Sequence, residues 1–119
     1  MKKTLVFGAS PNPARVSYDA VSRLSTRNYP VVAVGARAGR INSVEIHTDR
    51  PNVDNIDTIT LYLNPARQKE EYDYLLGLKP KRIIFNPGTE NPEFIQLAQN
   101  AGIQTEVACT LVLLSLGSY

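Results

Sequence analysis

Glycine, serine, asparagine and arginine follow one another closely where the first apolar run of the sequence ends. The run Thr4–Phe7 is followed by Gly8, Ser10, Asn12 and Arg15, and then by a segment with helical spacing. Glycine lets a ligand approach the backbone closely, and the free amides at the start of a helix attract anions. Hydroxyl and amide side chains add hydrogen bonds, and a guanidinium adds a full positive charge. The stretch therefore predicts a phosphate site, with a simple solvated turn as the alternative.

Two more arginines, Arg37 and Arg40, follow the second apolar run, Val31–Val34. A dinucleotide-binding loop of the G-x-G-x-x-G type would need glycines where this chain has Ser10 and Pro13. An NAD site also has an acidic residue after the second strand, which holds the ribose hydroxyls. The positive charge found here instead suits a ribose phosphate, as in NADP or coenzyme A. Two solvated loop arginines are the alternative.

These residues must be positioned by strands and helices that alternate along the chain. Short apolar runs predict strands, several of them covered on both faces, at Thr4–Phe7, Val31–Val34, Thr58–Leu63, Arg82–Phe85 and Ile103–Val107. Capping pairs and terminal glycines predict helices at about Ser17–Asn28, after Asn64-Pro65 as far as Gly77, after Asn91-Pro92 as far as Gly102, and at about Cys109–Leu116. The polar segment Gly35–Asp57 is expected to be a loop with at most a short strand at Val44–Ile46.

This alternation predicts an α/β fold, a Rossmann-like three-layer sandwich that forms one domain over residues 1–119. The expected sheet is parallel and five-stranded, with the strand order 3-2-1-4-5, so that the winding reverses between strands 1 and 4. Ligands of such sheets bind at the carboxyl ends of the strands, at that reversal. The loops GASPNPAR and NPGTENP would flank the site.

The composition excludes several classes of protein. The 119 residues are 20% charged with a net charge of +2, so an anion site must be local. The single cysteine allows no internal disulfide and gives no metal-ligand cluster. Neither the start Met1-Lys2-Lys3 nor the apolar run Leu111–Leu114 has the length of a signal or membrane segment. We therefore expect a soluble, cytoplasmic protein, and no nucleic-acid partner because basic and aromatic residues are not interleaved in a strip.

No residue pattern points to catalysis. His47 is the only histidine, and neither a nucleophile nor a set of metal ligands accompanies it, so a surface or edge-strand histidine is favoured. Cys109 begins an apolar segment and is expected to be a small core residue. The sequence thus favours a binding module over an enzyme and leaves the question of activity open.

The first part of the chain resembles a known family. VFGASPNPARVSYDAVSRLSTRNYPVVAVGAR is similar to the opening of the small stand-alone CoA-binding proteins, which are relatives of the CoA-binding domain of succinyl-CoA synthetase alpha subunits. The family pattern is matched at Gly8, Ala9, Ser10, Pro13, Arg15 and Ser17, and again at Gly88, Asn91, Ala98, Ala101 and Gly102. The chain departs from the family at Gly35-Ala36, which replaces N-P before the basic residue, and in its tail VACTLVLLSLGSY.

The resemblance implies coenzyme A or an acyl-CoA as the ligand and gives roles to the matching positions. The pyrophosphate would be received by Gly8, Ala9, Ser10, Asn12, Arg15 and Ser17, and the adenosine with its 3′-phosphate by Val34, Gly35, Arg37 and Arg40. The pantetheine arm would pass along Leu63, Pro65, Asn86, Pro87 and Gly88. Two other functions stay open: an NADP-binding oxidoreductase or redox sensor, and a structural domain that forms a homodimer through Leu111–Leu116.

Overall fold

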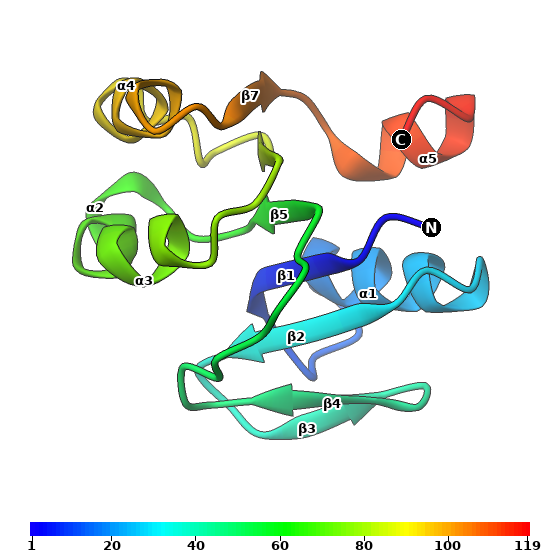
Figure 1. Ribbon diagram of the computed structural model, residues 1–119. Coiled ribbons are helices and arrows are strands. Elements are labelled where there is room, and N and C mark those ends of the chain that lie inside the picture. Colours follow the sequence, from blue (N-terminus) through cyan, green and yellow to red (C-terminus); the bar gives the residue numbers. More distant parts are fainter.

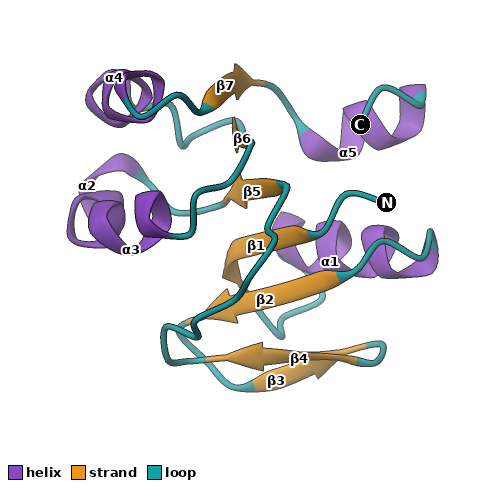
Figure 2. Ribbon diagram, in the orientation of Figure 1, coloured by secondary structure: helices purple, strands orange, loops and turns teal.

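The computed structural model describes residues 1–119, and strands and helices alternate through most of the chain (Figures 1 and 2). In chain order the elements are β1 (Thr4–Ala9), α1 (Val16–Thr26), β2 (Val31–Gly35), β3 (Gly39–Ile41), β4 (Val44–His47), β5 (Thr58–Leu61), α2 (Pro65–Gln68), the 3-10 turn η1 (Lys69–Glu71), α3 (Tyr72–Gly77), β6 (Arg82–Phe85), α4 (Pro92–Asn100), β7 (Gln104–Val107) and α5 (Thr110–Leu116). None of the helices combines the length and the apolar character needed to cross a bilayer.

The strands form one seven-stranded sheet in the order β3-β4-β2-β1-β5-β6-β7. Every neighbouring pair is parallel except β3 with β4, which forms an antiparallel hairpin at one edge. Helices α1 and α5 lie on one face of the sheet, and α2, α3 and α4 lie on the other (Figure 1). The predicted Rossmann-like α/β fold is therefore confirmed, with a sheet that is mostly and not wholly parallel.

The predicted strand number and order were wrong, because the segment 35–57 holds two strands. Of these, β4 pairs in parallel with β2 and so occupies the place that the prediction gave to the strand at Thr58–Leu63. That strand, β5, instead lies on the other side of β1. The winding consequently reverses between β1 and β5, and the loop NPGTENP after β6 lies one strand further along.

No helix connects β4 to β5, and the segment 48–57 crosses the sheet as an irregular chain (Figure 1). Val53 and Ile56 of this segment pack into the core between the sheet and α3. Arg50 anchors it: Nε and Nη2 each donate to a Glu71 carboxylate oxygen at 2.7 Å, and the guanidinium lies over the Phe7 ring. The segment thus covers the sheet without helical periodicity, which explains why no helix could be predicted there.

The predicted helix starts at the two Asn-Pro pairs are confirmed. Asn64 Oδ1 accepts a hydrogen bond from the Arg67 amide at 3.0 Å, and Asn91 Oδ1 accepts one from the Phe94 amide at 3.2 Å. Each proline occupies the first turn, where its missing N–H costs nothing. The predicted ends are close as well, since Gly102 and Gly117 follow α4 and α5 with positive φ angles.

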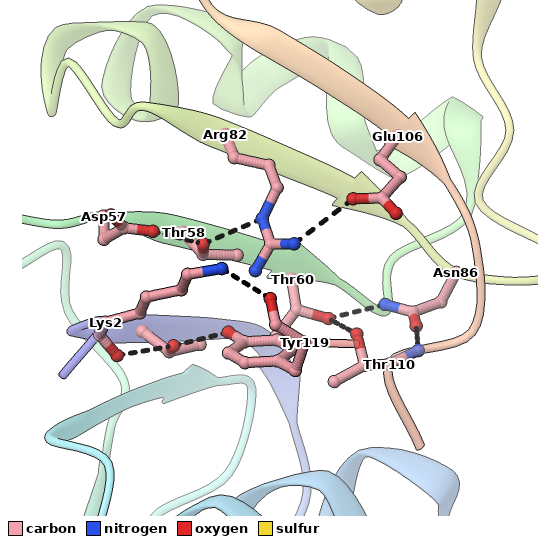
Figure 3. Close-up of polar contacts among 10 residues, drawn as sticks. Lys2, Asp57, Thr58, Thr60, Arg82, Asn86, Glu106, Thr110 and Tyr119 are labelled. Atoms are coloured by element: carbon pink, nitrogen blue, oxygen red, sulfur yellow. Dashed lines mark hydrogen bonds and ion pairs between the residues drawn. The ribbon is translucent and has the colours of Figure 1, made fainter. Parts of the chain in front are cut away.

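The two faces of the sheet differ in polarity. The face under α3 and α4 is apolar, with Leu5, Ile59, Phe85 and Phe94 at its centre. The face toward α1 and α5 holds a strip of buried polar side chains near α5 (Figure 3). In this strip Arg82 Nε donates to Thr58 Oγ1 at 3.0 Å, and its Nη1 donates to Glu106 Oε1 at 3.2 Å.

Asn86 joins three segments at the carboxyl end of this strip (Figure 3). Its Nδ2 donates to Thr60 Oγ1 at 2.6 Å and to the Leu61 carbonyl at 2.8 Å, and its Oδ1 accepts from the Thr110 amide at 2.8 Å. One side chain thereby fixes β5, β6 and the start of α5 to one another.

The Tyr62 hydroxyl lies beside the hydroxyls of Thr60 and Thr110 but has no hydrogen-bond partner. The two threonine hydroxyls bond to each other at 2.7 Å instead. Burial raises the pKa of Tyr62 to about 12, so the phenol holds its proton throughout the neutral range.

We expect Asn86→Ala to lower the free energy of unfolding by about 3 kcal/mol, because a buried amide, carbonyl and hydroxyl lose their partner. Urea denaturation measures the change. The matched control is Asn52→Ala, since Asn52 is exposed. A loss no larger than that of the control would contradict the structural role of Asn86.

We expect Tyr62→Phe to reduce the alkaline loss of stability. The folded pKa lies near 12 and the ordinary value is 10.0, so between these pH values the unfolded chain gives up its proton first. The free energy of unfolding then falls as pH rises, and below pH 10 this contribution is constant. Urea denaturation from pH 7 to 11 should show a shallower fall for the variant, with stability at pH 7 changed by less than about 1 kcal/mol because the lost hydroxyl is unpartnered. An unchanged slope would contradict this assignment.

Candidate functional site

An open cleft of about 560 Å³ lies at the carboxyl ends of β1, β5 and β6, where the winding of the sheet reverses. This is the place where open parallel sheets bind ligands. The cleft is lined by Gly8, Ala9, Ser10, Pro11, Asn12, Arg15, Ala36, Arg37, Tyr62, Leu63, Asn64, Arg67, Pro87, Gly88 and Thr89.

Gly8 forms the floor of the cleft as a bulge in β1. Phe7 pairs with Val34 and Ala9 with the next residue, Gly35, so Gly8 is left between two registers with a φ of +96°. A side chain here would place its Cβ 2.9 Å from the Leu63 side chain and 3.0 Å from the Tyr62 carbonyl carbon. Glycine is therefore required for β1 to lie against the end of β5, in addition to leaving the floor open.

The loop between β1 and α1 is held by its own side chains. Ser10 Oγ accepts from the Asn12 amide at 3.1 Å, and Asn12 Oδ1 accepts from the Ala14 amide at 3.0 Å. The Arg15 amide also donates to the Asn12 carbonyl at 3.0 Å. These bonds shape the loop and leave the Arg15 side chain exposed at the cleft.

The first turn of α1 has free hydrogen-bond donors. Arg15 is the N-cap residue and its side chain makes no capping bond, and the amides of Val16 and Ser17 have no partner in the protein. Such amides carry partial positive charge and suit a phosphate. They lie directly after the loop that lines the cleft.

The charge of the lining is one-sided. Arg15, Arg37 and Arg67 line the cleft, and none of them has a carboxylate within ion-pair distance. No lining residue is acidic. Three unpaired guanidiniums around one cavity make a strongly positive site in a chain whose net charge is only +2.

The wall opposite the β1 loop is fixed by a buried glutamine. Gln68 Nε2 donates to the carbonyls of Leu63 and Thr89, both at 2.8 Å, and Gln68 Oε1 accepts from Asn91 Nδ2 at 3.0 Å. The loops after β5 and β6 are therefore tied together beside the cleft.

Most of the residues that the sequence marked as candidates line this cleft, namely Gly8, Ala9, Ser10, Asn12, Arg15, Arg37, Leu63, Pro87 and Gly88. The others do not line it: Ser17, Val34, Gly35, Arg40, Pro65 and Asn86. Ser17 is a buried residue of the first turn of α1, and Val34 lies in the core. Pro65 is the exposed first residue of α2. The side-chain amide of Asn86 is already hydrogen-bonded within the protein, in the network described above.

Gly35 and Arg40 lie outside the cleft for different reasons. A Cβ at Gly35 would lie 2.0 Å from the Ala9 carbonyl oxygen, so this glycine serves the close approach of β2 to β1. Arg40 points from the edge hairpin, where Nη2 lies 3.7 Å from Glu45 Oε2. The positive charge of Arg40 is therefore already paired with the Glu45 carboxylate.

Six further residues line the cleft and were not predicted as candidates: Pro11, Ala36, Tyr62, Asn64, Arg67 and Thr89. Arg67 could have been predicted from the sequence, because it is the third residue after the cap Asn64. The first turn of the helix after β5 therefore places it at the same edge of the sheet as Arg15. Neither His47 nor Cys109 lines the cleft. His47 is half-buried on β4 with Nδ1 3.9 Å from Asp49 Oδ1, and Cys109 is half-buried at the start of α5.

The fold has solved relatives. One crystal structure of an uncharacterized protein is 45% identical, covers 100% of this chain and 98% of its own, and has a TM-score of 0.97. A hypothetical protein from Pyrococcus horikoshii OT3 is 24% identical over 93% of this chain and 80% of its own, with a TM-score of 0.82. A Thermus thermophilus structure is 20% identical over 99% of this chain and 90% of its own, with a TM-score of 0.85. The last two likenesses bear on the fold alone.

Comparison with curated proteins gives no match. The family model described as a CoA binding domain, in contrast, matches residues 2–115 and so takes in every strand, the cleft and its three arginines. With that extent of match, the chain belongs to the CoA binding domain family.

Proposed function

We propose that this chain binds coenzyme A or an acyl-CoA in the cleft between β1, β5 and β6. The observation that carries the proposal is the acid-free lining with three unpaired arginines in a member of the CoA binding domain family. Coenzyme A is an elongated polyanion with a pyrophosphate and a ribose 3′-phosphate. An open cleft of about 560 Å³ with positive walls suits such a ligand.

The pyrophosphate is proposed to lie over Gly8, against the start of α1. There the ligand would meet the free amides of Val16 and Ser17 and the guanidinium of Arg15. Backbone amides and a guanidinium give charge-assisted hydrogen bonds, the stronger kind in proteins. Ser10 and Asn12 would act mainly by holding the loop, because both already bond within it.

Arg37 is proposed to bind the ribose 3′-phosphate. It lies in the loop after β2, on the far side of β1 from β5, and it has no acidic partner. A phosphomonoester carries a charge of about −1.5 to −2 at neutral pH, which makes it the most charged single group of the ligand. The pantetheine arm would then leave in the other direction, past Leu63 and the loop Pro87–Gly88.

The chemistry of the lining supports a binding role without a reaction step. No histidine, cysteine, lysine or carboxylate lines the cleft. The phenol of Tyr62, with a pKa of about 12, keeps its proton at neutral pH. A general base needs a pKa near the working pH, and no lining side chain offers one. NADP, the alternative that the sequence left open, has no support in the family match.

The test is calorimetric titration of the purified chain with CoA, dephospho-CoA and NADPH at fixed ionic strength, together with mass spectrometry of ligand retained on gently purified protein. We expect saturable binding of CoA. Binding of NADPH without binding of CoA would contradict the proposal and favour the oxidoreductase reading.

We expect Arg37→Gln to weaken CoA binding by about tenfold or more, the worth of one charge-assisted hydrogen bond, and to leave dephospho-CoA binding unchanged. Titrations of both ligands measure the difference. The matched control is Arg27→Gln, because Arg27 is exposed at the opposite end of α1 from the cleft. An equal loss for both ligands would remove Arg37 from the 3′-phosphate.

A further inference from the structure

Arg67 is the third arginine of the cleft, and the function proposed above gives it no role. It lies in the first turn of α2, and its amide is fixed by the cap Asn64 at 3.0 Å. Helices α1 and α2 lie on opposite faces of the sheet (Figure 1). Arg15, at the start of α1, and Arg67 therefore reach the cleft from its two sides.

The part of the cleft that Arg67 borders is the part over β1. Beside the cleft lies a smaller cavity of about 90 Å³, and Arg67 lines both. The two cavities also share Gly8, Ala36 and Leu63, whereas the residues of the β6 loop line only the larger one. Arg67 thus shares the smaller cavity with the glycine floor, and of the residues proposed along the pantetheine arm only Leu63 lines that cavity.

The charge of Arg67 is available for a ligand. Two acidic residues, Glu70 and Glu71, line the smaller cavity. Glu71 is already bonded through both oxygens to Arg50, each at 2.7 Å, and Glu70 lies beyond ion-pair distance of Arg67. Arg67 is exposed, so its guanidinium is free to turn toward an anion over Gly8.

We propose that Arg15 and Arg67 clamp the two phosphates of one diphosphate from opposite sides of the cleft, above Gly8. The inference rests on the proposed function and extends it, since it makes Arg67 a residue that selects for a diphosphate. Each guanidinium can bond two oxygens of one phosphate in a planar fork. Two linked phosphates engage both arginines, whereas one phosphate engages one arginine fully.

The experiment titrates the wild-type chain, Arg67→Gln, Arg67→Lys and the control Arg27→Gln with CoA, dephospho-CoA, ADP and AMP. We expect Arg67→Gln to weaken the binding of CoA, dephospho-CoA and ADP by the same factor of about ten or more, and to weaken the binding of AMP far less. Arg67→Lys should recover part of the loss, because the charge remains and the fork is gone. Arg27→Gln should bind as the wild type does, and thermal melting should show equal folding in all variants.

The outcomes separate this inference from the function on which it rests. If the wild type binds CoA and Arg67→Gln binds it within about twofold, the clamp is overturned and CoA binding stands. If Arg67→Gln loses affinity for CoA but not for dephospho-CoA, Arg67 contacts the 3′-phosphate, and the clamp is also overturned. If the wild type binds ADP but not CoA, and Arg67→Gln loses ADP, the clamp stands and the CoA proposal fails. Binding of neither ligand by the wild type overturns both.

Discussion

The close approach of three backbones at the carboxyl end of the sheet is the constraint on which the rest of the cleft depends. At Gly35 a side chain would meet the Ala9 carbonyl, and at Gly8 it would meet the end of β5, with φ already at +96°. With only hydrogen on these two α-carbons, β2, β1 and β5 meet without intervening side chains. The result is a floor of bare backbone at the reversal of the sheet, with the walls left to the loops that follow each strand.

Six of the eight arginines fall into two groups according to whether a carboxylate lies near the guanidinium, and the other two, Arg23 and Arg27 at the far end of α1, are also unpaired. Arg40, Arg50 and Arg82 each lie within 3.7 Å of a carboxylate oxygen, on the edge hairpin, on the crossing segment and in the polar strip. The three in the cleft have no such partner, and no carboxylate lines it. The net charge of +2 does not reveal the positive cleft, because acidic residues elsewhere in the chain offset most of the positive charge. Local charge therefore says more about the ligand than the overall balance does.

The sequence predicted what local patterns determine and missed what pairing over distance determines. Asn64 and Asn91 were identified as caps because a cap needs only its own next three residues. The strand order was wrong because β4, expected at most as a short strand at Val44–Ile46 and not counted in the sheet, takes its place by pairing with β2. Asn86 was given a ligand contact by the resemblance to the CoA-binding family, and its place after a buried strand does not distinguish a side chain that faces a ligand from one that bonds a buried amide. Arg67 was missed because the cap at Asn64 places it in the first turn of α2, but only the pairing of β5 with β1 brings that turn to the cleft.

Two buried amides, Asn86 in the polar strip under α5 and Gln68 in α2 on the other face of the sheet, explain how the loops around the cleft keep their places. Asn86 and Gln68 each join two or more segments through bonds of 2.6–3.0 Å, and both are buried beneath the cleft walls. A fully bonded buried amide holds one arrangement, because any shift leaves several polar groups without partners. The entropy cost of ordering the cleft walls therefore falls on folding. A ligand that binds to walls already ordered does not lose affinity to that cost. The fixed walls keep the backbones of Arg15, Arg37 and Arg67 around one cavity while their side chains stay exposed, so the positive charge of the chain is concentrated at the cleft.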